Sequence, residues 1–168
     1  YVDDEPDLLE LGKIFLETTP GFTVDTLASA VAALAALPKK PYDAIVSDYQ
    51  MPTMDGIAFL KAVRSSGNTI PFILFTGRGR EEVVIEAINN GAEFYLQKGG
   101  DPLPQYTELA QKIRVAVDKY RAIRELRKQT FVLEERVKEL ACLYRLAEII
   151  SAQGLTLDDM LTEADSLI

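Results

Sequence analysis

The sequence predicts an α/β fold in which a doubly wound, five-stranded parallel sheet of strand order 2-1-3-4-5 precedes a long C-terminal coiled-coil helix. Short apolar runs alternate with amphipathic stretches through the first 120 residues. Most of the runs are apolar on both faces, as expected for parallel strands that helices cover on both sides. Five such units are too few to close an eight-stranded barrel, which leaves an open sheet.

Each predicted element has a local signal. Apolar residues recur at helical spacing after Pro6, which suits the first turn of a helix. Asp55 is placed to cap a later helix, and Asn90-Gly91 is placed to end the next one in a left-handed turn. The expected strands end at Val2 and span 22–28, 42–48, 70–77 and 92–98. The expected helices span 6–18, 29–37, 57–66, 80–91 and about 104–151.

Composition argues against several classes of protein. Of the 168 residues, 48% are hydrophobic, which is enough for a packed core. A formal net charge of −8 argues against a nucleic-acid partner, and the lack of histidine removes His-based triads and metal sites. Cys142 is the single cysteine, and no apolar run reaches membrane-spanning length. We therefore predict a cytoplasmic location without membrane attachment.

Polar side chains follow the predicted strands at the point where each strand ends. Asp3 and Asp4 follow the first strand, Asp48 ends the third, Thr76 the fourth and Lys98 the fifth. The carboxyl ends of parallel strands lie at one edge of the sheet, where ligands bind at the point of reversed strand order. We therefore expect these side chains to converge, with the three acids crowded together.

Three neighbouring carboxylates repel one another unless a cation offsets their charge. Oxygen ligands favour a hard ion, and Mg²⁺ is expected because it retains waters and needs few protein ligands. Asp4 and Asp48 are expected to bind the ion directly and Asp3 through a water, with the backbone carbonyl of Gln50 as a further ligand.

A metal ion, the Lys98 ammonium and the Thr76 hydroxyl around one carboxylate would together suit a phosphoryl group in transfer. Asp48 is then the expected nucleophile and forms an acyl phosphate. Taken alone, each residue has a plainer explanation: Asp48 as a cap or turn residue, Thr76 as a strand end and Lys98 as an ordinary exposed lysine.

Four short motifs together resemble a known family. They are "VDDEP", "DYQMPTMDG", "FTG" and "FYLQK". The chain closely resembles the CheY-like receiver domain of two-component response regulators over residues 1–120, and such domains have a flavodoxin-like strand order. One departure is Gly99, because the family usually has proline directly after the conserved lysine. We expect the loop before the last helix to be more flexible or to follow a different path.

The resemblance implies a phosphoacceptor signalling domain in a phosphorelay, not a classical enzyme. Asp48 would accept a phosphoryl group from a histidine kinase, Asp3 and Asp4 would hold Mg²⁺, and Thr76 and Lys98 would contact the phosphoryl group. Tyr95 is similar to the family's rotating switch aromatic, although core filling explains it equally well.

The sequence is also compatible with two other classes of function. One is a Mg²⁺-dependent phosphatase with a nucleophilic aspartate, but such enzymes place an acid two residues after the nucleophile, where this chain has Gln50. The other is an adaptor whose function is dimerisation alone. A longer protein could also carry a kinase domain.

Residues 121–151 have a heptad pattern, which predicts a parallel coiled coil and hence a homodimer. The seam consists of Ile123, Leu126, Thr130, Leu133, Val137, Leu140, Tyr144 and Ala147. An antiparallel helical pair and packing on a downstream domain are the alternatives. Residues 152–168 loosely resemble the entry to a GAF-type sensor domain, so we expect the chain to be the N-terminal part of a larger signalling protein with an output domain.

Overall fold

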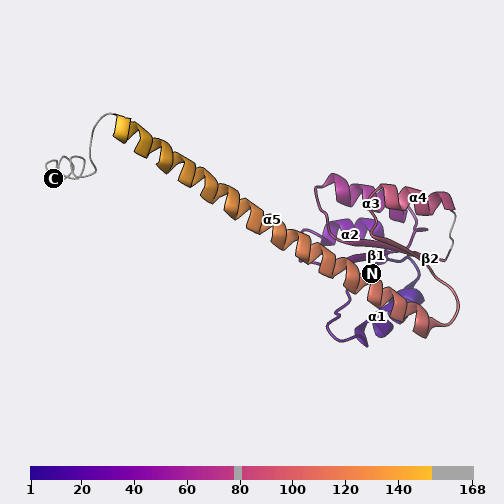
Figure 1. Ribbon diagram of the computed structural model, residues 1–168. Helices are drawn as coiled ribbons and strands as arrows, with labels where there is room; N and C mark the ends of the chain where they lie inside the picture. Colours follow the sequence, from indigo (N-terminus) through magenta and orange to yellow (C-terminus); the bar gives the residue numbers. More distant parts are fainter. Residues whose placement is uncertain (78–80, 153–168) are drawn as a thin grey trace. The chain divides into compact units, whose positions relative to one another are not determined.

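The computed structural model describes residues 1–77 and 81–152. The chain divides into two compact units, Tyr1–Arg121 and Ala122–Ile168. Figure 1 shows the helices and strands along the chain. The helices are α1 (Pro6–Glu17), α2 (Ala30–Ala36), α3 (Gly56–Ser65), α4 (Glu81–Asn89) and α5 (Pro102–Ala152). The strands are β1 (Ile45–Ser47), β2 (Phe72–Thr76) and β3 (Phe94–Gln97).

The sheet is parallel, with strand order β1-β2-β3. Ile45 pairs with Phe72 in the first ladder, and Ile73 pairs with Phe94 in the second. The last three predicted strands are therefore confirmed, and each of their ends lies within three residues of its expected position. The five-stranded sheet is not confirmed, because the described residues form three strands.

The two segments expected to be the first strands form isolated bridges instead. Val2 makes one parallel bridge to Leu27 on one side and one to Ser47 on the other. The backbone at the first bridge still bonds as in a parallel pair, because the Leu27 N–H donates to the Tyr1 carbonyl at 2.9 Å and the Asp3 N–H donates to the Leu27 carbonyl at 3.1 Å. The Val24 N–H donates to the Glu17 carboxylate at 2.9 Å.

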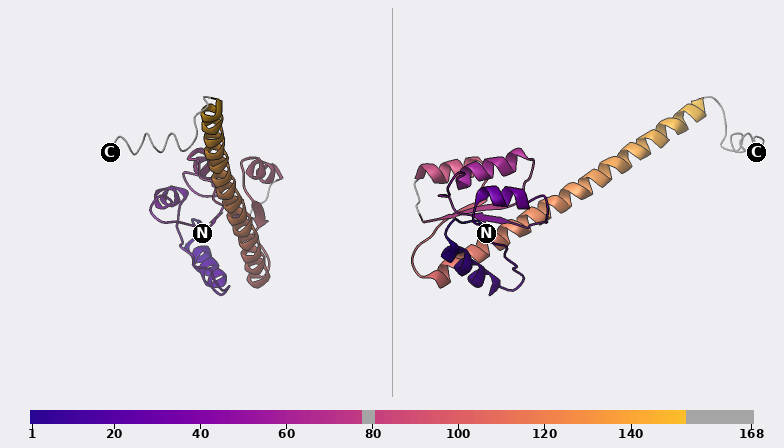
Figure 2. Two further views of the ribbon diagram at one scale, coloured as in Figure 1. Left: turned by 60° about the vertical axis from the view of Figure 1, so that its left-hand side comes forward. Right: turned by 180° about the vertical axis from the view of Figure 1, so that it is seen from behind.

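Helices cover both faces of the sheet, and each face has its own apolar cluster. In Figures 1 and 2, α2, α3 and α4 lie on one side of the strands and α1 lies on the other, with the first turns of α5 beside it. The first cluster includes Ala33, Phe59, Phe72, Leu74 and Val83. The second includes Leu16, Ile73, Phe75, Tyr106 and Ile113. Alternate residues of β2 therefore enter opposite clusters, as the pleat of a strand requires.

The predicted helix ends are confirmed where the structure tests them. Pro6 occupies the first turn of α1. Asp55 caps α3, because its side chain accepts a hydrogen bond from the Ala58 N–H at 2.7 Å. Gly91 follows α4 with φ +90°, and its N–H donates to the Ile88 carbonyl at 3.0 Å. Glycine adopts this left-handed conformation without the steric cost of a Cβ.

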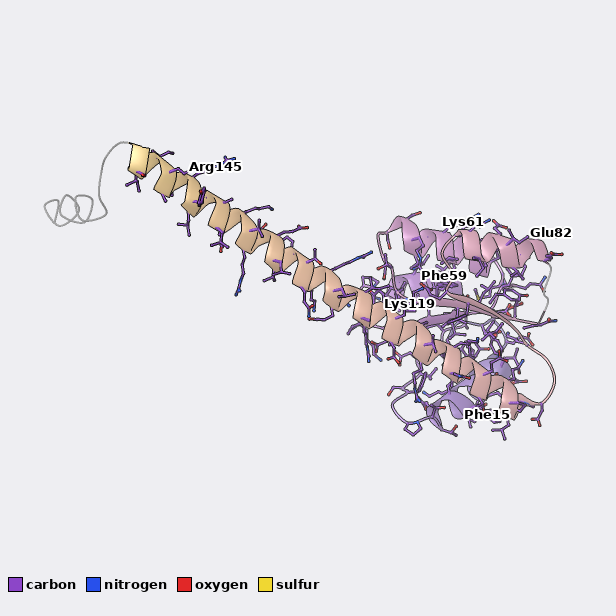
Figure 3. The ribbon with its side chains drawn as sticks, in the orientation of Figure 1. Phe15, Phe59, Lys61, Glu82, Lys119 and Arg145 are labelled. Carbon is purple, nitrogen blue, oxygen red and sulfur yellow. The ribbon has the colours of Figure 1, made fainter. Side chains whose placement is uncertain are left out.

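The described part of the second unit is helical as far as Ala152. Its side chains extend from the helix around Arg145 in Figure 3, whereas those around Phe59 in the first unit fill the space between elements. Large apolar residues in this helix are exposed; Leu133, Leu140 and Tyr144 are 62%, 65% and 68% accessible. The helix is confirmed, and the coiled coil stays a prediction. Within the described residues, no helix has both the length and the apolar content to cross a bilayer.

Candidate functional site

Backbone hydrogen bonds bring two of the predicted acids to one edge of the sheet. The Val2 N–H donates to the Val46 carbonyl at 2.8 Å, and the Asp48 N–H donates to the Val2 carbonyl at 2.8 Å. The next residue after Val2 is Asp3. Asp3 and Asp48 are 0% and 6% exposed, which is unusual for aspartate and requires compensating partners.

Lys98 supplies that compensation from the end of β3. Its N–H donates to the Thr76 carbonyl at 2.8 Å, which continues the β2–β3 pairing by one step. Its Nζ lies 2.5 Å from Asp3 Oδ2 and 2.8 Å from Asp48 Oδ1. A single ammonium therefore bridges two carboxylates that lie 45 positions apart in the sequence.

The trio of Asp3, Asp48 and Lys98 carries more negative than positive charge. Burial raises the pKa of Asp48, although hydrogen bonding to Lys98 opposes that shift. Burial alone would lower the pKa of Lys98, but its hydrogen bonds to Asp3 and Asp48 together raise it. With all three groups ionised, two negative charges face one positive charge. The site can therefore accommodate a further cation.

The loop after β1 holds the second oxygen of Asp48. The Gln50 N–H donates to Asp48 Oδ2 at 2.5 Å. Gly56, at the start of α3, allows the loop to pass closely, because a Cβ there would lie 2.3 Å from the Asp48 carbonyl and 2.8 Å from Leu74 Cδ1. Both oxygens of the Asp48 carboxylate thus accept hydrogen bonds, Oδ1 from Lys98 and Oδ2 from Gln50.

The three acids do not form the expected cluster. Asp4 is exposed, whereas Asp3 is buried, as alternation along an extended backbone explains. Among the described residues, no group of three or more acidic, His or Cys side chains is arranged to hold a metal ion. Two carboxylates with an uncompensated charge still suit Mg²⁺, which often takes one or two carboxylates and fills its remaining positions with water.

The two predicted switch residues lie near this trio. Thr76, the last residue of β2, is 1% exposed. Tyr95 packs against the first apolar cluster, and its buried hydroxyl has no hydrogen-bond partner among the described residues. Burial raises the pKa of Tyr95, and the negative charge of Asp48 adds to the shift.

The sequence reasoning missed a group of aromatic residues beside Asp3. The Tyr1 hydroxyl donates to Asp3 Oδ2 at 3.0 Å. The Tyr1 ring lies against α1 at Gly12, where a Cβ would meet the ring at 2.4 Å. Tyr106 of α5 is 4% exposed and packs edge-on against Phe75 at 5.7 Å. The signal for Tyr1 was its place two residues before Asp3, since such residues share a strand face.

A separate cavity of about 680 Å³ lies elsewhere in the first unit. Its lining includes Val24, Tyr42 and Ile113, and neither Asp48 nor Lys98 contributes to it. The trio of Asp3, Asp48 and Lys98 is therefore not part of this cavity.

Comparison with known sequences agrees with this geometry. The profile of the response regulator receiver domain family matches residues 1–114. The C4-dicarboxylate transport transcriptional regulatory protein DctD of Rhizobium meliloti is 35% identical over 125 residues, which are 73% of this chain and 27% of DctD. The transcriptional regulatory protein FixJ of Bradyrhizobium diazoefficiens is 35% identical over 98 residues, 58% of this chain and 48% of FixJ. The chain thus matches about a quarter of the length of DctD and about half of the length of FixJ.

Comparison with solved structures supports the same fold. The receiver domain of the Francisella response regulator 1452 superposes with a TM-score of 0.64 at 26% identity. The matched region covers 71% of this chain and 94% of that domain. The likeness thus extends over nearly all of that domain.

Proposed function

We propose, from the premise that this chain belongs to the response regulator receiver domain family, that Asp48 accepts a phosphoryl group from a histidine kinase. The observation that carries the proposal is the Lys98 ammonium, which bridges Asp48 at 2.8 Å and Asp3 at 2.5 Å at the carboxyl edge of the sheet. This arrangement places a fixed positive charge beside the attacking carboxylate, where phosphoryl oxygens would also lie.

In the transfer, an oxygen of the Asp48 carboxylate forms a bond to phosphorus as the bond from phosphorus to the donor breaks. The donor is the phosphorylated histidine of the kinase or a small acyl phosphate. The hydrogen bond from the Gln50 N–H holds Asp48 Oδ2 at 2.5 Å and orients the carboxylate. Lys98 and the Thr76 hydroxyl would contact the phosphoryl oxygens, and their charge and hydrogen bond would stabilise the product.

The residues that would hold Mg²⁺ are Asp3, Asp48, the exposed Asp4 and the backbone carbonyl of Gln50. When bound, the ion would offset the negative charge that the phosphoryl group adds to the site. The excess negative charge of the Asp3–Asp48–Lys98 trio supports this assignment.

The direct test is phosphoryl labelling. Acetyl phosphate with Mg²⁺ should label the wild-type chain, and Asp48→Asn should abolish the label. Asp118→Asn, at an exposed position on α5, is the matched control and should label normally. Full labelling of the Asp48 variant would refute the assignment.

We further propose that the phosphorylated state is relayed through Thr76, Tyr95 and α5 to an output domain. The Tyr95 hydroxyl is buried and has no hydrogen-bond partner within the described part of the chain, which supports a side chain with two available positions, because such a polar atom favours rearrangement towards a partner. We place the protein in the cytoplasm, with residues 1–120 as the receiver domain and residues 152–168, largely outside the described residues, as the start of a sensor domain.

We also propose that residues 121–151 form a parallel coiled coil in a homodimer. Exposed apolar side chains at heptad spacing support this, since a helix of this kind gains stability from burying its apolar stripe against a partner. The phosphatase alternative has less support, because Gln50 occupies the position where such an enzyme needs its acid.

A further inference from the structure

Asp3 accepts hydrogen bonds from three donors. Its Oδ1 accepts from the Glu5 N–H at 3.1 Å. Its Oδ2 accepts from two groups, the Tyr1 hydroxyl at 3.0 Å and the Lys98 Nζ at 2.5 Å. Asp3 is completely buried, so solvent water does not replace any of these donors. Lys98 therefore shares with Tyr1 the work of compensating the charge on Asp3 Oδ2.

The backbone directs the Tyr1 side chain to the same face as Asp3. The Leu27 N–H donates to the Tyr1 carbonyl at 2.9 Å, and the Asp3 N–H donates to the Leu27 carbonyl at 3.1 Å. Val2, which lies between them, donates instead to the Val46 carbonyl. Side chains two positions apart on an extended segment point to the same face. The Tyr1 hydroxyl therefore reaches Asp3 Oδ2 along one face of the segment.

Gly12 of α1 provides the space for the Tyr1 ring. A Cβ at Gly12 would lie 2.4 Å from Tyr1 Cε1 and 2.7 Å from Tyr1 Cδ1, which is closer than real Cβ contacts. Gly12 is buried within α1, where glycine is less favourable than alanine. The Phe75 ring of β2 lies 6.4 Å from the Tyr1 ring at an angle of 47°. Contacts with α1 and β2 therefore limit where the Tyr1 hydroxyl can lie.

The hydrogen bond from Tyr1 affects how Lys98 divides its charge between two acids. The Lys98 Nζ contacts Asp3 Oδ2 and Asp48 Oδ1. A second donor on Asp3 Oδ2 reduces the negative charge that Lys98 must compensate there. Without the hydroxyl, Asp3 would attract Lys98 more strongly, and less positive charge would be available beside Asp48.

We propose that Tyr1 is a positioning residue that, together with Gly12, sets the balance of Lys98 between Asp3 and Asp48. The proposal rests on the proposed function, because Lys98 has to contact the phosphoryl oxygens during transfer to Asp48. The same hydrogen bond weakens the attraction of Asp3 for Mg²⁺, since it already offsets part of the carboxylate charge. Tyr1 acts on the transfer through Asp3 and Lys98.

The test compares two properties of the 168-residue chain and its Tyr1→Phe variant. NMR titration with Mg²⁺ alone reports the affinity of the site for the ion, and labelling by acetyl phosphate at saturating Mg²⁺ reports the transfer rate. Tyr1→Phe should bind Mg²⁺ about threefold more tightly, because Asp3 has lost a donor. It should be labelled about tenfold more slowly, because Lys98 is held at Asp3. General structural damage would weaken both properties together.

Tyr42→Phe is the matched control for this variant. The Tyr42 hydroxyl donates to Asp25 Oδ2 at 3.0 Å, the same kind of bond at the same distance as between Tyr1 and Asp3. Neither Asp25 nor Tyr42 contributes to the trio of Asp3, Asp48 and Lys98, so both properties should stay at the wild-type values.

Gly12→Ala tests the same hydrogen bond without removing the hydroxyl. The added Cβ displaces the Tyr1 ring, so both properties should change in the same directions as in Tyr1→Phe. The double variant should change no more than Tyr1→Phe, because both substitutions act through one hydrogen bond. Gly12→Ala also decides the question if Tyr1→Phe fails to fold.

The results that contradict the positioning role and the phosphoacceptor assignment differ. If the wild type is labelled, any outcome for Tyr1→Phe other than a tighter Mg²⁺ site with slower transfer overturns the positioning role, and the phosphoacceptor assignment stands. If the wild type takes no label from acetyl phosphate with Mg²⁺, the phosphoacceptor assignment fails, and the positioning role fails with it.

Discussion

The two units of this chain share a helical spacing of apolar residues and differ in what covers them. In the first unit, Leu109 of α5 is completely buried, because the sheet lies against it. In the second unit, Leu140 of the same helix is 65% exposed. Periodicity therefore predicts which face of a helix is apolar and leaves open what that face contacts.

The difference has an energetic consequence. A buried leucine side chain stabilises a fold by about 1.5–3 kcal/mol relative to an exposed one. The first unit buries its apolar side chains within one chain, so its stability should not depend on protein concentration. The helix of the second unit can bury its apolar side chains only against a partner, so it should become more stable as protein concentration rises.

The largest expected effect concerns the exposed apolar residues of the second unit. Leu133→Glu combined with Leu140→Glu places unpaired charges in the proposed seam. We expect the dimer dissociation constant to rise by about 100-fold or more, because burying such charges costs several kcal/mol. Sedimentation velocity should show the mass fall from dimer to monomer.

Phe131→Glu is the matched control for that experiment. Phe131 is 64% exposed but lies outside the heptad seam, so its variant should remain dimeric. A wild-type chain that is monomeric at micromolar concentration would contradict the coiled coil altogether.

A second effect tests whether the first unit is stabilised by its own packing. Gly56→Ala places a Cβ 2.3 Å from the backbone carbonyl of Asp48, where little can yield. We expect a loss of about 1–3 kcal/mol in unfolding free energy, measured by urea titration. Gly77→Ala, where a Cβ meets no atom within 4 Å, should cost less. Equal losses in the two variants would show that close packing at Gly56 does not decide stability.

A smaller effect concerns strain in the loop after Asp48. Thr53 has φ +71°, a conformation that β-branched residues rarely adopt. Thr53→Gly should raise the unfolding free energy by about 1 kcal/mol, because relieved strain outweighs the added entropy of the unfolded chain. Thr69→Gly, at an exposed position without positive φ, should lower it. A loss at both positions would show that the loop does not store this strain.

The smallest effect tests the electrostatics of the site. The pKa of Asp48 is raised by burial, so the folded state holds its proton at a pH where the unfolded chain has lost it. The associated stability is complete below the unfolded pKa of about 3.9 and is lost as pH rises through the folded value. Asp48→Asn should therefore raise the melting temperature at neutral pH by a few degrees and gain little below about pH 4. An equal gain at both pH values would contradict a titrating origin.

The sequence predicted the helices and the last three strands because their signals are local. The Asp55 cap and the Gly91 turn depend on neighbouring backbone atoms and were confirmed. The strand expected at 22–28 is not confirmed, because this segment makes a single isolated bridge, between Leu27 and Val2. The motif "VDDEP" predicted that Asp3 and Asp4 act as a pair, and it did not predict that Asp3 is buried while Asp4 is exposed.

The sequence alone was enough to predict the order of the helices and of the last three strands, the family, and the place of Asp3, Asp48 and Lys98 at the strand ends. It could do so because parallel strands place their carboxyl ends at one edge, whatever the details of packing. Only the tertiary structure decided that Lys98 bridges Asp3 and Asp48 and that Tyr95 and Tyr106 lie on opposite faces of the sheet. Contacts between residues far apart in the chain depend on how side chains fill a shared space, and no local pattern contains that information.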